Sequence, residues 1–171
     1  MGCLNMTINL ETLILTRYDE AKHKELFESF KNGDSFSKFI HEVCKRLEAS
    51  KNNFNNIFQS SFVVECNNIP IGYLYVSSNE KDEVFLEYSI LKQYRNQGFG
   101  KMLLNQASDF LFQNYNIRCI RADVDPSNKN SMLLLESCGY IFDEEEYEKR
   151  NFIGNMQFFK ESDCYYLKRR K

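Results

Sequence analysis

The chain has 171 residues, of which 43% are hydrophobic and 27% charged, and its formal net charge is −2. This length and composition predict a single globular domain, residues 1–171, that can bury a hydrophobic core. The charge balance excludes the basic surface typical of nucleic-acid-binding proteins, and no apolar run approaches the ~20 residues of a membrane span.

The N-terminal third predicts one strand followed by two helices. Residues 10–17 form an apolar run typical of a strand. Asp19 is a suitable cap for a short polar helix that ends near residue 30. From residue 35, phenylalanine and aliphatic residues recur at helical spacing and predict a second helix with one apolar face. We expect His23 and His41, which lie on these helices, to be surface residues.

Three strands follow and form an antiparallel meander. Residues 58–66 and 69–77 are rich in valine, isoleucine, phenylalanine and tyrosine. The pair Asn67-Asn68 between them suits a tight hairpin turn, because asparagine tolerates a positive φ angle. Residues 84–91 then form the third strand of the meander.

The C-terminal half alternates helices with strands. A helix that follows the glycine segment ends near residue 116, and residues 118–125 form a strand. Ser127 or Asn128 caps the next helix, which stops at Gly139. The segments 140–148 and 157–168 are predicted to be the last two strands.

The resulting order, β-α-α-β-β-β-α-β-α-β-β, predicts an α/β (α+β layered) fold with a mixed, mostly antiparallel sheet of about seven strands flanked by helices. A helix connects strands 84–91 and 118–125. Such a crossover places its two strands parallel to each other.

Two of the chain's seven glycines lie in the segment QYRNQGFGKM (residues 93–102), between an apolar strand and an apolar helix. Unpaired backbone N–H groups and the positive end of the helix dipole make such a turn an anion site. Arg95 and Lys101 add positive charge, so we expect a phosphate or pyrophosphate here. The segment lacks the third glycine of a dinucleotide fingerprint and also fails the G-x-x-x-x-G-K-[ST] pattern, which disfavours both of those nucleotide sites.

The segment does fit R-x-x-G-x-G, at Arg95, Gly98 and Gly100, and this motif resembles the acetyl-CoA signature of the GNAT superfamily of N-acetyltransferases. A second block occurs at the expected distance: N-x-x-S at residues 128–131, followed by an apolar helix and Gly-Tyr at 139–140. The resemblance extends from about residue 10 to residue 167. The residue sequence of the second block is most similar to that of the GNAT branch that acetylates the N-termini of ribosomal proteins.

This resemblance implies that the turn binds the pyrophosphate of acetyl-CoA and that the adjoining strand end pairs with the pantetheine arm. It also implies that the parallel strands splay apart to admit that arm. For Asn128, helix capping and cofactor contact remain equal alternatives. The cofactor-binding residues predicted in this way are Ile90, Leu91, Arg95, Asn96, Gln97, Gly98, Phe99, Gly100, Lys101 and Asn128.

Acetyl transfer to an amine requires a base, because an alkyl amine with a pKa of about 10.4 arrives protonated. Glu87 interrupts one apolar strand and Asp123 the neighbouring one, so both are candidate catalytic residues, with Glu87 preferred. Either carboxylate could instead lie on an exposed face of its strand. Asp123 and Asp125 share a strand face, but no third ligand is visible, and we expect no metal.

Many GNAT enzymes carry a tyrosine on the last helix that protonates the departing thiolate, and Leu135 occupies that position here. The leading hypothesis is an acetyl-CoA-dependent N-acetyltransferase that acts by direct attack in a ternary complex. The acceptor is a small amine or a peptide N-terminus. Leu135 keeps an alternative open, a non-catalytic acyl-CoA-binding or sensing module of the same fold.

The six cysteines include no C-x-x-C pair and no neighbouring histidine at ligand spacing, which argues against a zinc site and a disulfide framework. A reducing cytoplasm is therefore the expected location, with no membrane or nucleic-acid partner. Acidic runs near residues 80–83 and 143–148 are either solvated surface or a means of steering a cationic amine to the site. The sequence leaves open whether the protein is a monomer or a homodimer.

Overall fold

The computed structural model describes residues 7–9, 12–17, 19, 21–24, 28, 60–78, 82–145, 148 and 164–169. Within these ranges eight strands form one mixed sheet in the order β1-β2-β3-β4-β5-β6-β8-β7. Neighbouring strands run antiparallel except β5 and β6, which are parallel. The predicted fold class is therefore confirmed.

The strands and helices lie close to the predicted positions in the central part of the chain. The strands are β1 (Thr7–Asn9), β2 (Ile14–Thr16), β3 (Ser60–Cys66), β4 (Ile69–Ser77), β5 (Glu83–Ile90), β6 (Cys119–Val124), β7 (Ile141–Phe142) and β8 (Cys164–Arg169). A 3-10 turn, η1 (Lys92–Tyr94), leads into helix α3 (Phe99–Asn114), and helix α4 (Lys129–Ser137) follows β6. None of the helices in these described ranges is long and apolar enough to cross a membrane.

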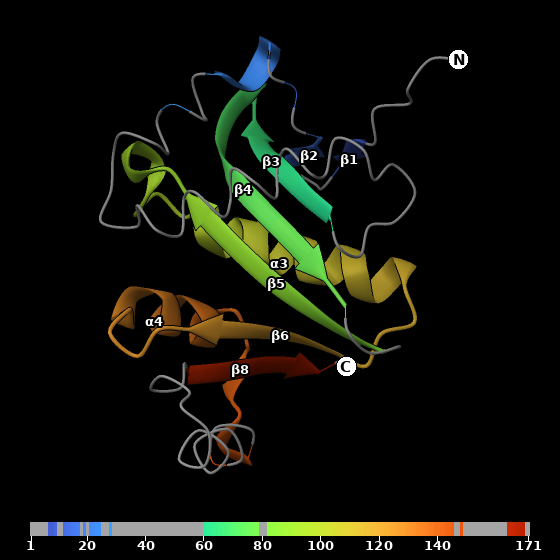
Figure 1. Ribbon diagram of the computed structural model, residues 1–171, viewed down its shortest axis with the longest axis vertical. Coiled ribbons are helices and arrows are strands. Elements are labelled where there is room, and N and C mark those ends of the chain that lie inside the picture. Colours follow the sequence, from blue (N-terminus) through green and yellow to red (C-terminus); the bar gives the residue numbers. More distant parts are fainter. Residues whose placement is uncertain are drawn as a thin grey trace, which may run out of the picture.

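Helix α3 covers one face of the sheet and crosses behind β4 and β5 in Figure 1. Leucines and an alanine of α3 pack into one core with apolar residues of β3 to β6 and with Leu135 of α4. At about 25 cal/mol per Å² of buried apolar area, this packing is the main source of stability. The contacting side chains include Leu103, Leu104, Ala107 and Leu111 from α3, and Val84, Leu86, Ile90, Ile120 and Ala122 from the sheet.

Two turns adopt the backbone conformation that their residues favour. Asn67 and Asn68 have φ angles of 51° and 63°, as expected for the tight β3–β4 hairpin. Gly139 has a φ of 81° immediately after α4, which is the conformation that commonly ends a helix. Both predictions are confirmed.

Two predictions about the ends of the chain are only partly right. Of the described residues in the predicted strand 10–17, only Ile14–Thr16 form a strand, β2, which pairs with an additional strand, β1. Of the described residues in the predicted strand 140–148, only Ile141 and Phe142 form a strand, β7, and Glu144, Glu145 and Glu148 are helical. Consecutive glutamates favour a helix over a strand, which explains why β7 ends so early. The last predicted strand is present as β8, while residues 157–163 lie outside the described residues, as does the predicted helix from residue 35 with His41.

His23 is buried, contrary to our expectation that it lies on the surface, with 1% of its side chain exposed. Its Nδ1 accepts a hydrogen bond from the backbone N–H of Asp19, and its Nε2 lies 3.0 Å from the Glu65 carboxylate. Thr16 and Lys22 also donate to Glu65, and these hydrogen bonds hold the pKa of this buried carboxyl below its usual range despite its burial. The cluster joins the first helical segment to β2 and β3.

Candidate active site

The parallel strands β5 and β6 are paired at one end only. Their register runs from Glu83 opposite Cys119 to Phe85 opposite Arg121. Beyond that point they have no mutual pairing, although β5 continues to Ile90 and β6 to Val124. In Figure 1 the tips of the two arrows diverge. The predicted splayed pair is therefore confirmed, and we call the opening between its unpaired ends the gap.

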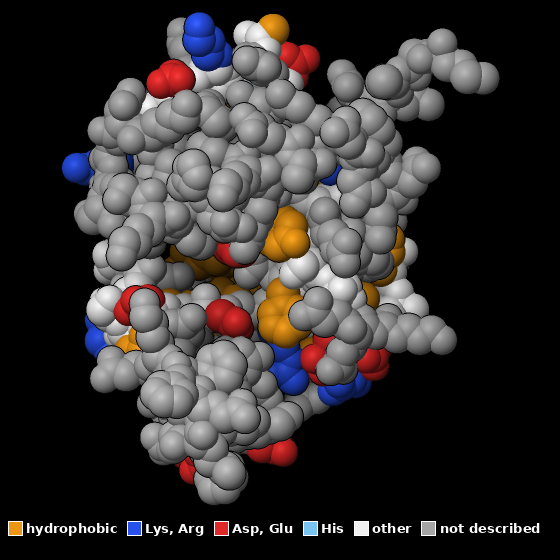
Figure 2. All heavy atoms as spheres, in the orientation of Figure 1, with side chains coloured by type: hydrophobic (Ala, Val, Ile, Leu, Met, Phe, Trp, Pro, Cys, Tyr) orange, Lys and Arg blue, Asp and Glu red, His pale blue; other side chains and the backbone are white. Residues whose placement is uncertain are grey.

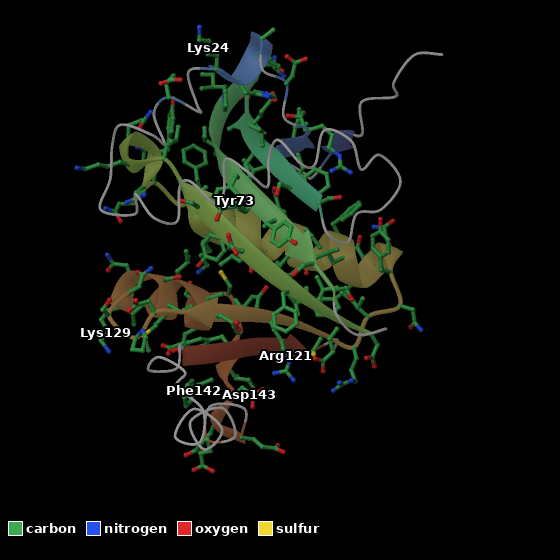
Figure 3. All side chains as sticks on the ribbon, in the orientation of Figure 1. Lys24, Tyr73, Arg121, Lys129, Phe142 and Asp143 are labelled. Carbon is green, nitrogen blue, oxygen red and sulfur yellow. The ribbon has the colours of Figure 1, made fainter. Side chains whose placement is uncertain are left out.

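An ion-pair cluster fixes the closed end of this strand pair. Glu83 is buried and accepts hydrogen bonds from Arg118 and from Arg121, whose Nε lies 2.8 Å from the carboxylate. Arg121 also bonds Asp143, just beyond β7, at 2.6 Å, and the two side chains lie side by side in Figure 3. The hydrogen bond from Arg121 is the main reason that the pKa of Glu83 lies below its usual range. The separation is thus confined to the opposite end.

The turn that carries the predicted phosphate site lies directly beyond the open end of β5. Gly98 is the N-cap of α3 and has a φ of 87°, and Asn96 has a φ of 60°. No side chain caps this helix, so the first N–H groups of α3 have neither an intrahelical acceptor nor a capping side chain. A Cβ atom added to Gly98 would meet nothing within 4 Å, so the space in front of the turn is open. The geometry fits a bound pyrophosphate.

At Gly100 a residue without a side chain is needed for a different reason, the packing of two helices. It lies inside α3, and a Cβ atom there would come within 2.9 Å of Cδ2 of Leu134 on α4. The second glycine of the motif therefore allows the two helices to pack closely. The sequence alone could not separate these two roles.

Several other predicted cofactor-binding residues form hydrogen bonds that shape the turn itself. Nε of Arg95 donates to the Ile90 carbonyl at 2.8 Å. The Leu91 N–H donates to Ile71 of β4, and the Leu91 carbonyl accepts from Tyr94. Gln97 donates from its side chain to the Gln93 carbonyl. These bonds fix the path from β5 into α3, with Lys101 exposed on the first turn of the helix and Phe99 packed edge-on against Tyr94.

Asn128 caps α4 at the other side of the gap. Its side-chain oxygen accepts a hydrogen bond from the backbone N–H of Ser131 at 3.1 Å, which is the capping role considered for it. Asp125 also accepts from both the backbone and the hydroxyl of Ser127, so the connection from β6 to α4 is short and well defined. The first turn of α4 is thereby held next to the open end of β6.

Glu87 and Asp123 lie on the same face of the sheet, on opposite sides of the gap. Continuing the β5–β6 register by two residues places Asp123 opposite Glu87. Alternate residues of a strand point to opposite faces. Since Val84, Leu86 and Ile90 pack in the core against α3, Glu87 points away from the helix face. Glu87 is half-buried and accepts a hydrogen bond from the Tyr73 hydroxyl at 2.8 Å, while Asp123 is exposed.

The space-filling view agrees with this arrangement. Figure 2 shows a hollow near the middle of the molecule, with hydrophobic side chains at its floor and acidic side chains near its edges. It lies where Figure 1 places the space between the diverging tips of β5 and β6. The site therefore combines an uncapped helix start whose geometry fits an anion, an opening in the sheet, and two carboxylates beside that opening.

Comparison with known proteins agrees with this combination. Residues 21–140 match the model of the family described as "Acetyltransferase (GNAT) family". The chain belongs to the acetyltransferase (GNAT) family. A spermidine N(1)-acetyltransferase from Vibrio cholerae is 24% identical over 136 residues, which cover 79% of this chain and 71% of that protein.

Solved structures of other acetyltransferases share the fold over almost the whole chain. A candidate ribosomal-protein-serine acetyltransferase from Vibrio cholerae has a TM-score of 0.75 at 17% identity, with 99% of this chain and 100% of that chain covered. The ribosomal L7/L12 α-N-protein acetyltransferase RimL, solved in complex with coenzyme A, has a TM-score of 0.72 at 14% identity, with 96% and 98% covered. At these identities the likeness shows the fold alone.

Leu135 lies on α4, at the position where the resemblance to the family implies a tyrosine. Leu135 is fully buried in the core, with 0% of its surface exposed, and has no group that can donate a proton. Sequence reasoning found no substitute. The structure shows a hydroxyl pair close by, in which the Tyr88 hydroxyl lies 2.9 Å from Oγ of Ser131. No local signal in the sequence connects these two residues.

Proposed function

We propose that the protein transfers an acetyl group from acetyl-CoA to a primary amine, by direct attack of the amine within one ternary complex. The observation that carries this proposal is the pair of carboxylates, Glu87 and Asp123, beside a gap that ends at an anion-binding turn. Bound acetyl-CoA supplies an activated thioester. A protonated amine that enters from the carboxylate face needs a base at that position, and Glu87 provides one.

The acceptor belongs to the class of small amines and peptide N-termini. Related proteins named for spermidine and for ribosomal-protein N-termini support this class. Glu87 and Asp123 both face the side from which an acceptor would approach, and two carboxylates suit a cationic amine. Backbone N–H groups of β5 near Tyr88 would stabilise the charge that develops on the thioester oxygen.

Release of free thiol from acetyl-CoA across a panel of amines tests the proposed activity. The panel includes spermidine, peptides with free N-termini, and the same peptides with blocked N-termini as controls. We expect turnover with at least one free amine and none with its blocked counterpart. Binding of acetyl-CoA without turnover of any amine would instead support the non-catalytic acyl-CoA-binding module.

Direct transfer is distinguished from a covalent acetyl-enzyme by its labelling pattern. Of the cysteines whose burial the structure describes, Cys119 and Cys138 are buried, which limits their access to a thioester, and Cys66 is half-buried. Protein quenched during turnover of radiolabelled acetyl-CoA should carry no covalent label. Label on any cysteine, in an amount that rises and falls with turnover, would overturn the direct route.

A further inference from the structure

A buried tyrosine on β4 contacts the candidate base. The hydroxyl group of Tyr73 donates a hydrogen bond to Oε1 of Glu87 at 2.8 Å, and only 1% of the tyrosine is exposed. An ionised carboxylate can only accept hydrogen bonds, so the tyrosine is the donor. A tyrosine hydroxyl usually has a hydrogen-bond partner when it is buried, and here one such partner is Glu87.

Tyr73 lies on a strand that is paired on both sides. Its Cα partners are Val63 on β3 and Ser89 on β5. In Figure 1, β4 runs between these two strands. Glu87, in contrast, lies on β5 beyond Phe85, the last residue of that strand that pairs with β6. Among the strands that the structure describes, β4 alone therefore pairs with the part of β5 that carries Glu87.

The contact between Tyr73 and Glu87 is diagonal across the two strands. Tyr75 is the residue directly opposite Glu87, and Tyr73 lies two positions away on the same face of β4. Such diagonal neighbours are about 7–8 Å apart, within reach of an aromatic side chain. In Figure 3, Tyr73 and Arg121 of β6 lie on opposite sides of β5. The two tyrosines thus occupy the side of Glu87 toward β4, whereas the gap and Asp123 lie on its other side.

We propose that Tyr73 is a positioning residue for acetyl transfer, whose hydroxyl group holds the carboxylate of Glu87 at the edge of the gap. This inference rests on the proposed acetyltransferase function. A base must lie within hydrogen-bond distance of the proton that it removes, and a glutamate side chain has several rotatable bonds. The bond from a rigid, fully paired strand restricts these rotations. Tyr73 therefore acts through Glu87 and not on the substrates.

The chemical step balances without a proton from Tyr73. Glu87 takes one proton from the ammonium group of the acceptor, and the neutral nitrogen forms a bond to the thioester carbon. The carbon–sulfur bond breaks, and its electron pair stays on sulfur. The second proton of the nitrogen neutralises this thiolate through solvent, and Glu87 later releases the first proton to solvent. Tyr73 keeps its own proton throughout.

The variant Tyr73→Phe tests the proposal, because it removes only the hydroxyl group. We expect kcat to fall about 10-fold, the lower end for the loss of a hydrogen bond to a charged group. KM for acetyl-CoA should stay the same, since the turn before α3 is not altered. The matched control is Tyr166→Phe, because Tyr166 is also buried and donates to a glutamate, Glu136 of α4, at 3.1 Å. An equal fall of kcat in the control would argue against positioning.

A double-mutant cycle distinguishes positioning of the base from a general structural role. In Glu87→Gln the side chain still offers an oxygen to Tyr73 but is no longer a base. If Tyr73 acts only through Glu87, adding Tyr73→Phe to Glu87→Gln should lower kcat no further. Losses that multiply in the double variant would overturn the proposal, because Tyr73 would then affect something other than the base.

Failure of this inference is distinguishable from failure of the proposed function. A wild-type protein that acetylates no amine of the panel would refute the proposed function, and the role of Tyr73 with it. An active wild type that is slowed by Glu87→Gln but not by Tyr73→Phe would refute only the role of Tyr73.

Discussion

At the scale of single residues, Gly98 and Gly139 offer a matched pair. Both have a positive φ, 87° and 81°, and a Cβ at either position would meet nothing within 4 Å. Replacement by alanine should cost each about 1–2 kcal/mol of folding stability, through backbone strain alone. Only Gly98→Ala should also weaken the binding of acetyl-CoA, because the added methyl group would lie in the space in front of the N-terminus of α3. Denaturant unfolding and calorimetric titration measure the two effects, and an equal loss of affinity in Gly139→Ala would argue against cofactor approach at Gly98.

Glu87 also has a matched control. Glu87 accepts a hydrogen bond from Tyr73, and Glu136 on α4 accepts one from Tyr166. If Glu87 is the base, Glu87→Gln should lower kcat by about 10²–10⁴-fold while affinity for acetyl-CoA hardly changes. Glu136→Gln should leave kcat close to that of the wild type. Wild-type kcat in Glu87→Gln, together with a large loss in Asp123→Asn, would transfer the role to Asp123.

The sequence predicted those residues whose role is set by their neighbours along the chain. The hairpin turn at Asn67 and Asn68 and the helix end at Gly139 both follow from the residue types at those positions. It did not predict the Tyr88–Ser131 bond or the burial of His23 against Glu65. Those contacts join residues more than 40 positions apart, and only the packing of helices on the sheet brings them together.

At the scale of elements, the closed end of the β5–β6 pair depends on Glu83. Removing one partner of a buried ion pair typically costs about 3–5 kcal/mol of folding stability. We expect Glu83→Gln to cost the lower end of this range, because Arg121 retains its hydrogen bond to Asp143. Asp82→Asn is the control, since Asp82 pairs with the same Arg118 but 47% of its side chain is exposed. This variant should cost at most about 1 kcal/mol of folding stability. Denaturant unfolding at neutral pH compares the two variants.

The same carboxylate gives a prediction for acid stability. The pKa of Glu83 is lower in the folded protein than its ordinary value, so its stabilisation is complete above the unfolded pKa of about 4.3. It is lost as the pH falls through the lower, folded pKa. Glu83→Gln should therefore unfold with a shallower dependence on pH below about 4.3 than the wild type, with Glu65 accounting for part of the remaining slope. An unchanged slope, measured by thermal melts from pH 7 to pH 3, would contradict this.

The helices and strands were predictable where the spacing of hydrophobic residues and the positions of turn residues indicated the same element with the same bounds. Strand β4 was predicted with its exact bounds, and α3 and β6 within a few residues of them. The segment 140–148 was not, because its apolar start resembles a strand whereas its glutamates favour a helix. Only the pairing of Ile141 and Phe142 with β8 determines where one structure gives way to the other.

At the scale of the whole molecule, the order of elements was enough to predict a mixed α/β sheet with one parallel pair, and the resemblance to the GNAT superfamily implied that this pair splays apart. The evidence for it was strongest between residues 84 and 140, where two motifs lie on the expected elements. The N-terminal third of the chain was supported only by element order, and a substrate is recognised by side chains that no short motif determines. The family could therefore be predicted from the sequence, whereas the acceptor amine could not.

Binding of acetyl-CoA should stabilise the whole domain, because its turn, β5 and the first turn of α4 belong to one sheet-and-helix core. A ligand that binds only the folded state at 100 times its Kd contributes about 2.7 kcal/mol. For a domain of this size, that corresponds to a rise in Tm of roughly 5–10 °C. The rise should continue with the logarithm of ligand concentration and should shrink in Gly98→Ala but not in Gly139→Ala. A Tm that does not respond to millimolar acetyl-CoA in the wild type would contradict the cofactor site itself, whatever the acceptor.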